Sequence, residues 1–143
     1  MEEADVKNNE LTSLTVSSNT KLLLLDVQNN EQLKSIDASM LTDLEELQCS
    51  YTGLTTLDVT YNTKLVKLIC SNNKLTTLDL SKNTLLERLF CDGNQLTSLD
   101  LSNNTKLNYL ECSGNGMSAC ALNDLYYDLP KWSRTPSKGN LFI

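Results

Sequence analysis

Four cysteines recur at equal intervals along this chain and are its most conspicuous chemical feature. They stand 21 residues apart and are Cys49, Cys70, Cys91 and Cys112. Thiols in series could ligate a metal or form disulfides, but side chains that are parallel and in register on adjacent coils do not readily adopt the disulfide torsion. Cysteine is also a small side chain that proteins often bury. Because Val6 and Val27 occupy the same series upstream, we interpret the cysteines as core packing and expect no metal site.

Aspartates form a second series with the same period, and they are Asp37, Asp58, Asp79 and Asp100. They point outward, where stacked carboxylates repel each other unless something compensates. One interpretation is a calcium site, and the other is bonding to neighbouring backbone N–H groups and to Ser or Thr hydroxyls. The Gly-rich nonapeptides of calcium-binding β-rolls are absent, which favours the second interpretation. A glycosidase pair is disfavoured, because it requires one carboxylate in a distinct environment that raises its pKa.

Other catalytic chemistry has little material in this chain. There is no histidine, which removes the commonest general base and the usual partner of a nucleophilic Ser or Cys. There is no Gly-rich phosphate loop and no plausible triad. The fifth cysteine, Cys120, makes the number odd and gives no disulfide framework. We therefore predict that the chain is not an enzyme and that it needs no cofactor.

The elements that must position these side chains are two arms that alternate within each period. One arm, here called the Cys arm, reads LVKLICSNNK at 65–74, and the other, the Asp arm, reads LTTLDLSKNTL at 75–85. Cys arms begin at Met1, Leu22, Leu44, Leu65, Leu86 and Leu107, and Asp arms begin at Leu11, Leu33, Leu54, Leu75 and Leu96. The first turns are degenerate, since Ala38 replaces a leucine while Leu41 and Thr52 interrupt the two Asn series.

Both arms share the pattern L-x-x-L-x-L-x-x-N, with cysteine in place of the third leucine in the later Cys arms, and the second and third members are two residues apart. In an extended strand such residues point inward together, and the residues beside them point outward. The Asn can turn the chain and bond the backbone of neighbouring coils. Stacked coils place equivalent strands about 4.8 Å apart, as in a parallel sheet. The pattern predicts a mostly parallel β solenoid with two short extended arms per coil, stabilised by stacking.

This alternation resembles the nested 21-residue class of bacterial leucine-rich repeats, called IRREKO, over roughly residues 1–116. It is also similar to segments of internalin-like surface proteins from Bacteroidetes. The resemblance implies a leucine-rich-repeat solenoid that recognises proteins, at the cell surface or after secretion. Because this chain departs from the pattern at Ala38, Leu41 and Thr52, we expect its N-terminal turns to be less regular.

The repeat ends near Asn115, and a cap follows it. We predict a solenoid domain at 1–116, of about five and a half coils, and a C-terminal cap at 117–143. In the cap, the stretch at about 119–129 has apolar residues at helical spacing, Pro130 ends that helix, and 140–143 form a short strand. Such a cap covers the open end of a solenoid. Met1 enters in mid-repeat, which suggests a boundary cut from a longer chain.

Composition limits the partners of this single domain of 143 residues. The net charge is −6, and an acidic chain lacks the basic face that nucleic acids and anionic membranes require. The longest apolar run, at 22–25, is far too short to cross a bilayer. We expect neither nucleic-acid binding nor membrane insertion.

The outward residues of the Cys arm vary from coil to coil, whereas those of the Asp arm are nearly constant Ser, Thr and Asp. Ile69, Phe90 and Tyr109 would lie on neighbouring coils, beside Arg88. Exposed aromatics next to arginine on a rigid sheet are typical of binding hot spots. The candidate ligand-binding patch comprises Leu24, Glu46, Gln48, Lys67, Ile69, Arg88, Phe90, Tyr109 and Glu111.

The alternative for this patch is a ladder of cross-strand pairs that only stabilises the sheet, with Arg88 on Tyr109 and Glu46 paired with Lys67. For the whole chain, the leading hypothesis is a non-catalytic module that binds a protein, with a glycan as another ligand. The competing hypothesis is a structural spacer in a larger adhesin. No signal peptide is recognisable at the N-terminus, so a secreted or surface location follows from the resemblance alone.

Overall fold

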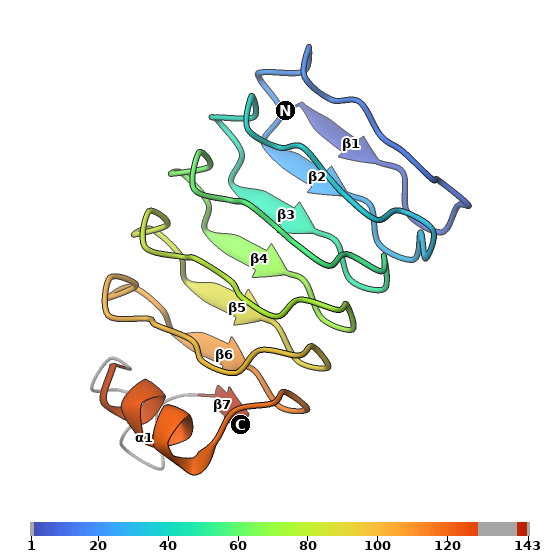
Figure 1. Ribbon diagram of the computed structural model, residues 1–143. Coiled ribbons are helices and arrows are strands. Elements are labelled where there is room, and N and C mark those ends of the chain that lie inside the picture. Colours follow the sequence, from blue (N-terminus) through green and yellow to red (C-terminus); the bar gives the residue numbers. More distant parts are fainter. Residues whose placement is uncertain (1, 129–139, 143) are drawn as a thin grey trace.

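The computed structural model describes residues 2–128 and 140–142. Within these residues, seven parallel strands form one sheet in sequence order, and one helix follows the sixth strand (Figure 1). The elements are β1 Glu3–Asp5, β2 Leu24–Asp26, β3 Glu46–Gln48, β4 Lys67–Ile69, β5 Arg88–Phe90, β6 Tyr109–Glu111, α1 Ala119–Asp128 and β7 Asn140–Phe142. The predicted parallel solenoid with a helix in its C-terminal cap is thereby confirmed.

The strands are short because the chain turns after every arm to close a coil. The central residue of a typical strand is a fully buried leucine, so that Leu68 of β4 pairs with Leu89 of β5. The residues on either side point outward, since side chains alternate along a strand. Each strand residue pairs with the equivalent residue of the next coil, and equivalent residues therefore form columns along the solenoid axis.

Within the described residues of the repeat, only the Cys arms contribute strands to the sheet, and β7 adds the last strand after the helix. The Asp arms run extended on the other side of each coil without strand pairing. A backbone bond joins them to the next coil, as where the N–H of Gln95 donates to the carbonyl of Leu75 at 2.8 Å. Each Asp arm ends in a tight turn, in which the N–H of Asn83 donates to the carbonyl of Leu80 at 3.0 Å. The solenoid thus has one sheet face and one extended, polar face.

Leucines from both arms fill the interior of the coils. Leu65 and Leu86 of the Cys arms and Leu75 and Leu80 of the Asp arms are at most 1% exposed. Burying each such side chain stabilises the fold by about 1.5–3 kcal/mol. Because each leucine stacks on the equivalent leucines of the coils above and below, this stabilisation requires neighbouring coils.

Buried asparagines connect successive coils. Asn94 Nδ2 donates to the carbonyl of Cys91 in its own coil and to that of Cys70 in the preceding coil, both at 3.0 Å. Its Oδ1 accepts the N–H of Leu75 at 3.1 Å. In the Asp-arm series, Asn83 Nδ2 donates to two carbonyls of the preceding coil. These bonds satisfy backbone groups that the turns would otherwise leave unpaired inside the core.

The irregular positions of the first coils do not disturb the strand register. β2 and β3 pair like the later strands, with Leu25 opposite Leu47. Thr52 takes an Asn position, and its hydroxyl lies 2.8 Å from the carbonyl oxygen of Cys49. Leu41 takes the other Asn position and is fully buried. The first strands therefore keep the register of the later ones, and the expectation that the N-terminal turns are less regular stays a prediction.

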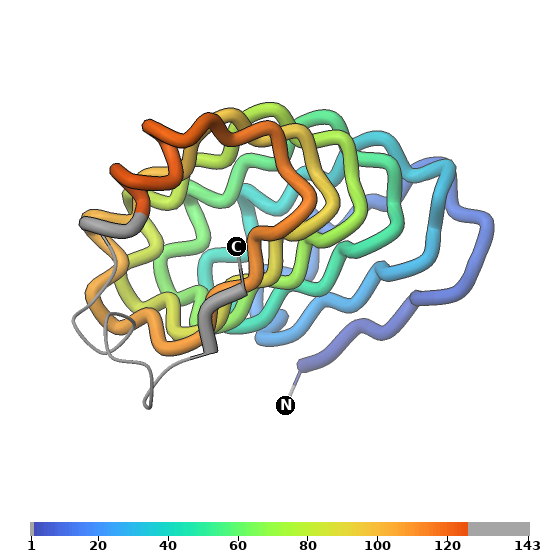
Figure 2. Tube along the Cα trace, turned by 90° about the horizontal axis from the view of Figure 1, so that it is seen from below, coloured from blue at the N-terminus to red at the C-terminus, as the bar shows by residue number. Residues whose placement is uncertain are grey.

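The helix α1 lies at the C-terminal end of the solenoid, beside the last coil (Figures 1 and 2). Its Leu125 is 1% exposed and belongs to the core. No helix of the described residues is long and apolar enough to cross a membrane. The predicted features that lie outside these residues are the entry at Met1, the helix end at Leu129 and Pro130, and the last strand residue, Ile143. The division into a solenoid at 1–116 and a cap at 117–143 stays a prediction.

Candidate functional site

The cysteine series forms a buried column just after strands β3 to β6. Cys49, Cys70 and Cys91 are fully buried, Cys112 is 3% exposed, and all four are free thiols. Burial raises the pKa of Cys49 to about 12 and that of Cys112 to about 11. It also raises the pKa of Cys70 and Cys91 well above the usual value. Such thiols stay protonated and unreactive, so the column contributes packing and no surface chemistry.

The aspartate series lies exposed on the Asp-arm side, and each carboxylate is bonded within its own arm. Asp58 Oδ1 accepts the backbone N–H of Thr60 at 2.9 Å and its hydroxyl at 2.7 Å. Asp37, Asp79 and Asp100 accept the N–H of the serine two residues further on. These hydrogen bonds lower the pKa of all four carboxyls. In the part of the chain that the structure describes, no three Cys, Asp or Glu side chains gather as a metal site.

The outward residues of the Cys arms line the sheet face in two columns. One column contains Glu3, Leu24, Glu46, Lys67, Arg88 and Tyr109, and the other contains Asp5, Asp26, Gln48, Ile69, Phe90 and Glu111. The nine residues of the predicted patch therefore lie together on this face. Eight of them are half-buried, and Arg88 alone is exposed. The contacts of these side chains divide the face into two unlike halves.

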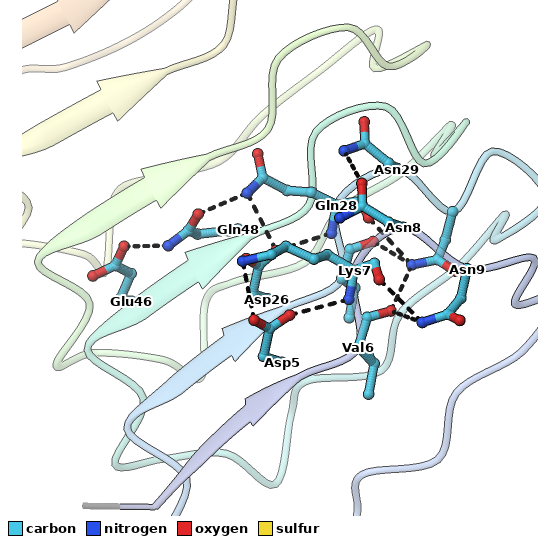
Figure 3. A network of polar contacts seen from close by, with 12 residues as sticks. Asp5, Val6, Lys7, Asn8, Asn9, Asp26, Gln28, Asn29, Glu46 and Gln48 are labelled. Carbon is cyan, nitrogen blue, oxygen red and sulfur yellow. Dashed lines mark hydrogen bonds and ion pairs between the residues drawn. The ribbon is translucent and has the colours of Figure 1, made fainter.

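The half over β1 to β3 is occupied by a continuous polar network (Figure 3). Gln28 Nε2 donates to Gln48 Oε1 at 2.7 Å and to Asp26 Oδ1 at 3.2 Å. Lys7 Nζ lies 3.4 Å from Asp26 Oδ2 and 3.0 Å from Asp5 Oδ2. Asp26 is only 4% exposed, and a buried charge is tolerated when it is paired and hydrogen-bonded in this way.

The network continues across β3 to β4. Gln48 Nε2 donates to Glu46 Oε1 at 2.6 Å, and the same oxygen accepts Lys67 Nζ at 2.6 Å. The Glu46–Lys67 pair expected for a stabilising ladder is therefore present. Since Glu46, Gln48 and Lys67 are engaged with one another, a ligand that bound them would first have to break these bonds.

The half over β4 to β6 is aromatic. The rings of Phe90 and Tyr109 stack with centroids 4.6 Å apart and planes at 27°. This contact is diagonal, because the register places Phe90 opposite Glu111 and Tyr109 opposite Arg88. The Tyr109 hydroxyl donates to Glu111 Oε2 at 3.3 Å, and burial together with Glu111 raises the pKa of Tyr109. Because each ring holds the other in place, the pair is preorganised for contact with a partner.

A shallow groove of about 340 Å³ runs along the N-terminal ends of β1 to β5. Four residues of the predicted patch line it, namely Leu24, Glu46, Lys67 and Arg88. The sequence reasoning missed its other lining residues, which are Glu3, Leu23, Glu45, Val66 and Glu87. The signal of the last four in the sequence is the position after the first leucine of each Cys arm, which also varies from coil to coil, whereas Glu3 belongs to the outward column of Leu24.

Among the residues whose side chains the structure describes, three large apolar side chains outside this face are more than half exposed. They are Met40 at 52%, Tyr51 at 51% and Tyr61 at 58%. All three lie in the turns between arms, which the sequence reasoning did not consider as sites. Their signal was that each replaces a polar residue found at the same turn position of other coils.

The structural neighbours of the chain are bacterial leucine-rich-repeat proteins of the internalin type. The functional domain of InlJ from Listeria monocytogenes, which includes a cysteine ladder, is 35% identical over 87% of this chain, with a TM-score of 0.61. A leucine-rich-repeat protein of Leptospira interrogans is 28% identical over 92% of the chain, with a TM-score of 0.86. An internalin, InlF, of L. monocytogenes is 28% identical over 86%, with a TM-score of 0.72.

These neighbours confirm the leucine-rich-repeat fold that the alternating arms predicted. The chain spans 33%, 36% and 38% of the lengths of these three structures. No family model and no curated protein matches the chain.

Proposed function

We propose that this leucine-rich-repeat solenoid, whose structural neighbours are internalin-type proteins of bacteria, is a non-catalytic module that binds a protein. The binding surface is the half of the sheet face over β4 to β6, with Ile69, Arg88, Phe90, Tyr109 and Glu111. The observation that supports it is the contrast between this half, with its stacked rings, and the half whose polar groups bond to each other.

The side chains of the aromatic half can form stabilising contacts with a partner, whereas those of the polar half already form hydrogen bonds and ion pairs with one another. Phe90 and Tyr109 are half-buried, so covering their remaining surface adds hydrophobic stabilisation. Arg88 is exposed at the rim of the groove and forms no ion pair within the described residues. Preorganised aromatic rings with an adjacent arginine have the composition of interaction hot spots.

The proposal also includes the class of the repeat, the location of the protein relative to the cell and the kind of ligand. The nested 21-residue class is supported by two unlike arms that alternate from Leu44 to Cys112, and relatives in Bacteroidetes are proposed from the resemblance of the repeat alone. A position outside the cell or at its surface is supported by the resemblance to internalin-like surface proteins. A glycan is the alternative ligand, since aromatic rings also bind sugars.

The second candidate function is a structural spacer within a larger adhesin. The polar network favours it for β1 to β3, because a surface that satisfies its own hydrogen bonds needs no partner. The share of each neighbour that the chain covers, 33–38% for the three compared, is compatible with a segment of this kind.

Binding can be tested with the immobilised chain and extracts of cell-surface proteins, followed by identification and titration of the captured partner. Arg88→Glu and Phe90→Ala should each weaken the affinity at least about thirtyfold, the loss of a hot-spot contact. Lys74→Glu is the matched control, because it makes the same charge change at an exposed lysine outside this face. Unchanged affinity in both test variants would reject this surface, and the absence of any partner would support the spacer.

A further inference from the structure

A second surface, away from the sheet face, is rich in lysine and suggests a ligand other than the protein partner proposed above. It consists of the five turns that precede β2 to β6, on the left of Figure 1. We call it the turn ridge, and its segments are 17–21, 39–43, 60–64, 81–85 and 102–106. It carries four lysines and one aspartate, a formal charge of +3 in a chain of net charge −6. The lysines are Lys21, Lys64, Lys82 and Lys106.

The lysines of the ridge are exposed and ordered by the repeat. Lys21 and Lys64 both pair with Asp43, at 3.0 and 2.7 Å, and their side chains remain 73% and 57% exposed. Such exposed pairs contribute about 0–1 kcal/mol, so an anionic ligand can replace the aspartate at little cost. Lys21, Lys64 and Lys106 share one turn position in alternate coils, and their backbones are therefore about 10 Å apart. At the flanks of the ridge, the carboxylate of Glu45 attracts the charge of Lys64, and that of Asp79 attracts the charge of Lys82.

Hydroxyl and apolar groups accompany these charges. The turn position before Lys21, Lys64 and Lys106 is threonine in every coil, and all five threonines are exposed: Thr20, Thr42, Thr63, Thr84 and Thr105. Met40 and Tyr61 occupy one turn position in successive coils, and their side chains are 52% and 58% exposed. An aromatic ring can stack on the apolar face of a sugar, while hydroxyls bond to its polar edge. Lysines supply point charges for its acidic substituents.

We propose that the turn ridge binds a linear acidic polysaccharide. The positive charge of the ridge selects an anion, and its repeating row of equivalent side chains suits a polymer that itself repeats. A folded protein partner is better matched by varied side chains, such as those of the sheet face. An anionic membrane would contact only a single narrow row of lysines, and the membrane surface would repel the rest of this acidic chain.

The experiment measures binding of the whole chain to immobilised heparin and alginate, which are sulfated and carboxylated, with neutral dextran as the uncharged control. The double variant Lys82→Glu/Lys106→Glu should bind at least about tenfold more weakly, because two contacts become repulsive. Lys34→Glu/Lys74→Glu makes the same charge change on exposed lysines outside the ridge and should retain most of the affinity. Equal losses in the two double variants would show unspecific attraction and overturn the proposal.

Tyrosine variants separate stacking from charge. Tyr61→Asn should weaken binding several-fold, whereas Tyr51→Asn removes an equally exposed ring on the opposite turns and should not. Both variants are compatible with the fold, because Asn103 and Asn72 hold the same positions in other coils. Polyglutamate, tested in parallel, should bind more weakly than the polysaccharides. The proposal fails if no acidic polysaccharide binds above dextran, if polyglutamate binds as tightly, or if Tyr51→Asn and Tyr61→Asn behave alike.

Discussion

Removal of the Asn94 amide tests the idea that buried asparagines hold the coils together. The side chain makes bonds of 3.0 to 3.1 Å to the carbonyls of Cys70 and Cys91 and to the N–H of Leu75. Alanine leaves the N–H of Leu75 without a partner, and each carbonyl loses one of two amide donors, because Asn73 also donates to Cys70 and Asn115 also donates to Cys91. Threonine can replace one of the bonds, because Thr52 occupies the equivalent place and its hydroxyl reaches a main-chain carbonyl at 2.8 Å.

The magnitude follows from one buried N–H left unpaired and from two bonds lost by carbonyls that keep another donor. The unpaired donor costs about 1–3 kcal/mol and each lost bond about 0.5–1.5 kcal/mol, and the alanine cavity adds to this. We expect Asn94→Ala to lower the free energy of unfolding by about 3–5 kcal/mol, and Asn94→Thr by about 1–3 kcal/mol. Typical domains have only about 5–15 kcal/mol in total, so Asn94→Ala should be close to unfolded at 37 °C.

The assay is urea unfolding followed by circular dichroism, with the slope m compared among the variants. Asn103→Ala, at an exposed asparagine of the turn ridge, is the control and should stay within about 0.5 kcal/mol of the parent chain. The reasoning is refuted if Asn94→Ala costs less than about 1 kcal/mol at unchanged m. It is also refuted if threonine proves as costly as alanine, because the recovered bond would then contribute nothing.

Four further predictions concern the core and the two residue series. Leu68→Ala, at a fully buried strand centre, should cost about 2–5 kcal/mol in the same assay, and a value below that range would show that the coils collapse around the gap. A thiol reagent should label only Cys120 in the native chain, since the other four cysteines are buried. Folding raises the pKa of Cys70, so the stabilisation by its protonated thiol is complete below about pH 9 and declines at higher pH. The parent chain should therefore lose more free energy of unfolding between pH 8 and 10 than the Cys70→Val variant does. Equal losses would contradict this prediction. NMR titration should find Asp58 and Asp79 with pKa values below 3.8, so that their contribution to stability is present above that pH and is lost as pH falls through the folded values; shifts on adding millimolar calcium would revive the metal interpretation.

Much of the fold could be read from local spacing. Leucines two residues apart, as at Leu78 and Leu80, predict an inward-facing extended segment, and their recurrence in each coil predicts the solenoid. Valine at position 27 of the cysteine series predicts packing at that place, and the column is indeed buried. Thr52 interrupts the Asn series without disturbing the strand register, because its hydroxyl bonds to a main-chain carbonyl as the asparagine amides do.

The sequence by itself determined the solenoid, its inward columns and the face on which the varied residues gather, because these depend only on a repeat period and on alternation along a strand. The tertiary structure alone decided which residues of that face are available to a partner. Gln28 and Lys7 reach the face from the turns that follow their strands, and they occupy the side chains over β1 to β3. Phe90 meets Tyr109 diagonally and not through the strand register. Such contacts depend on how far a side chain extends toward the next coil, which spacing along the chain does not specify.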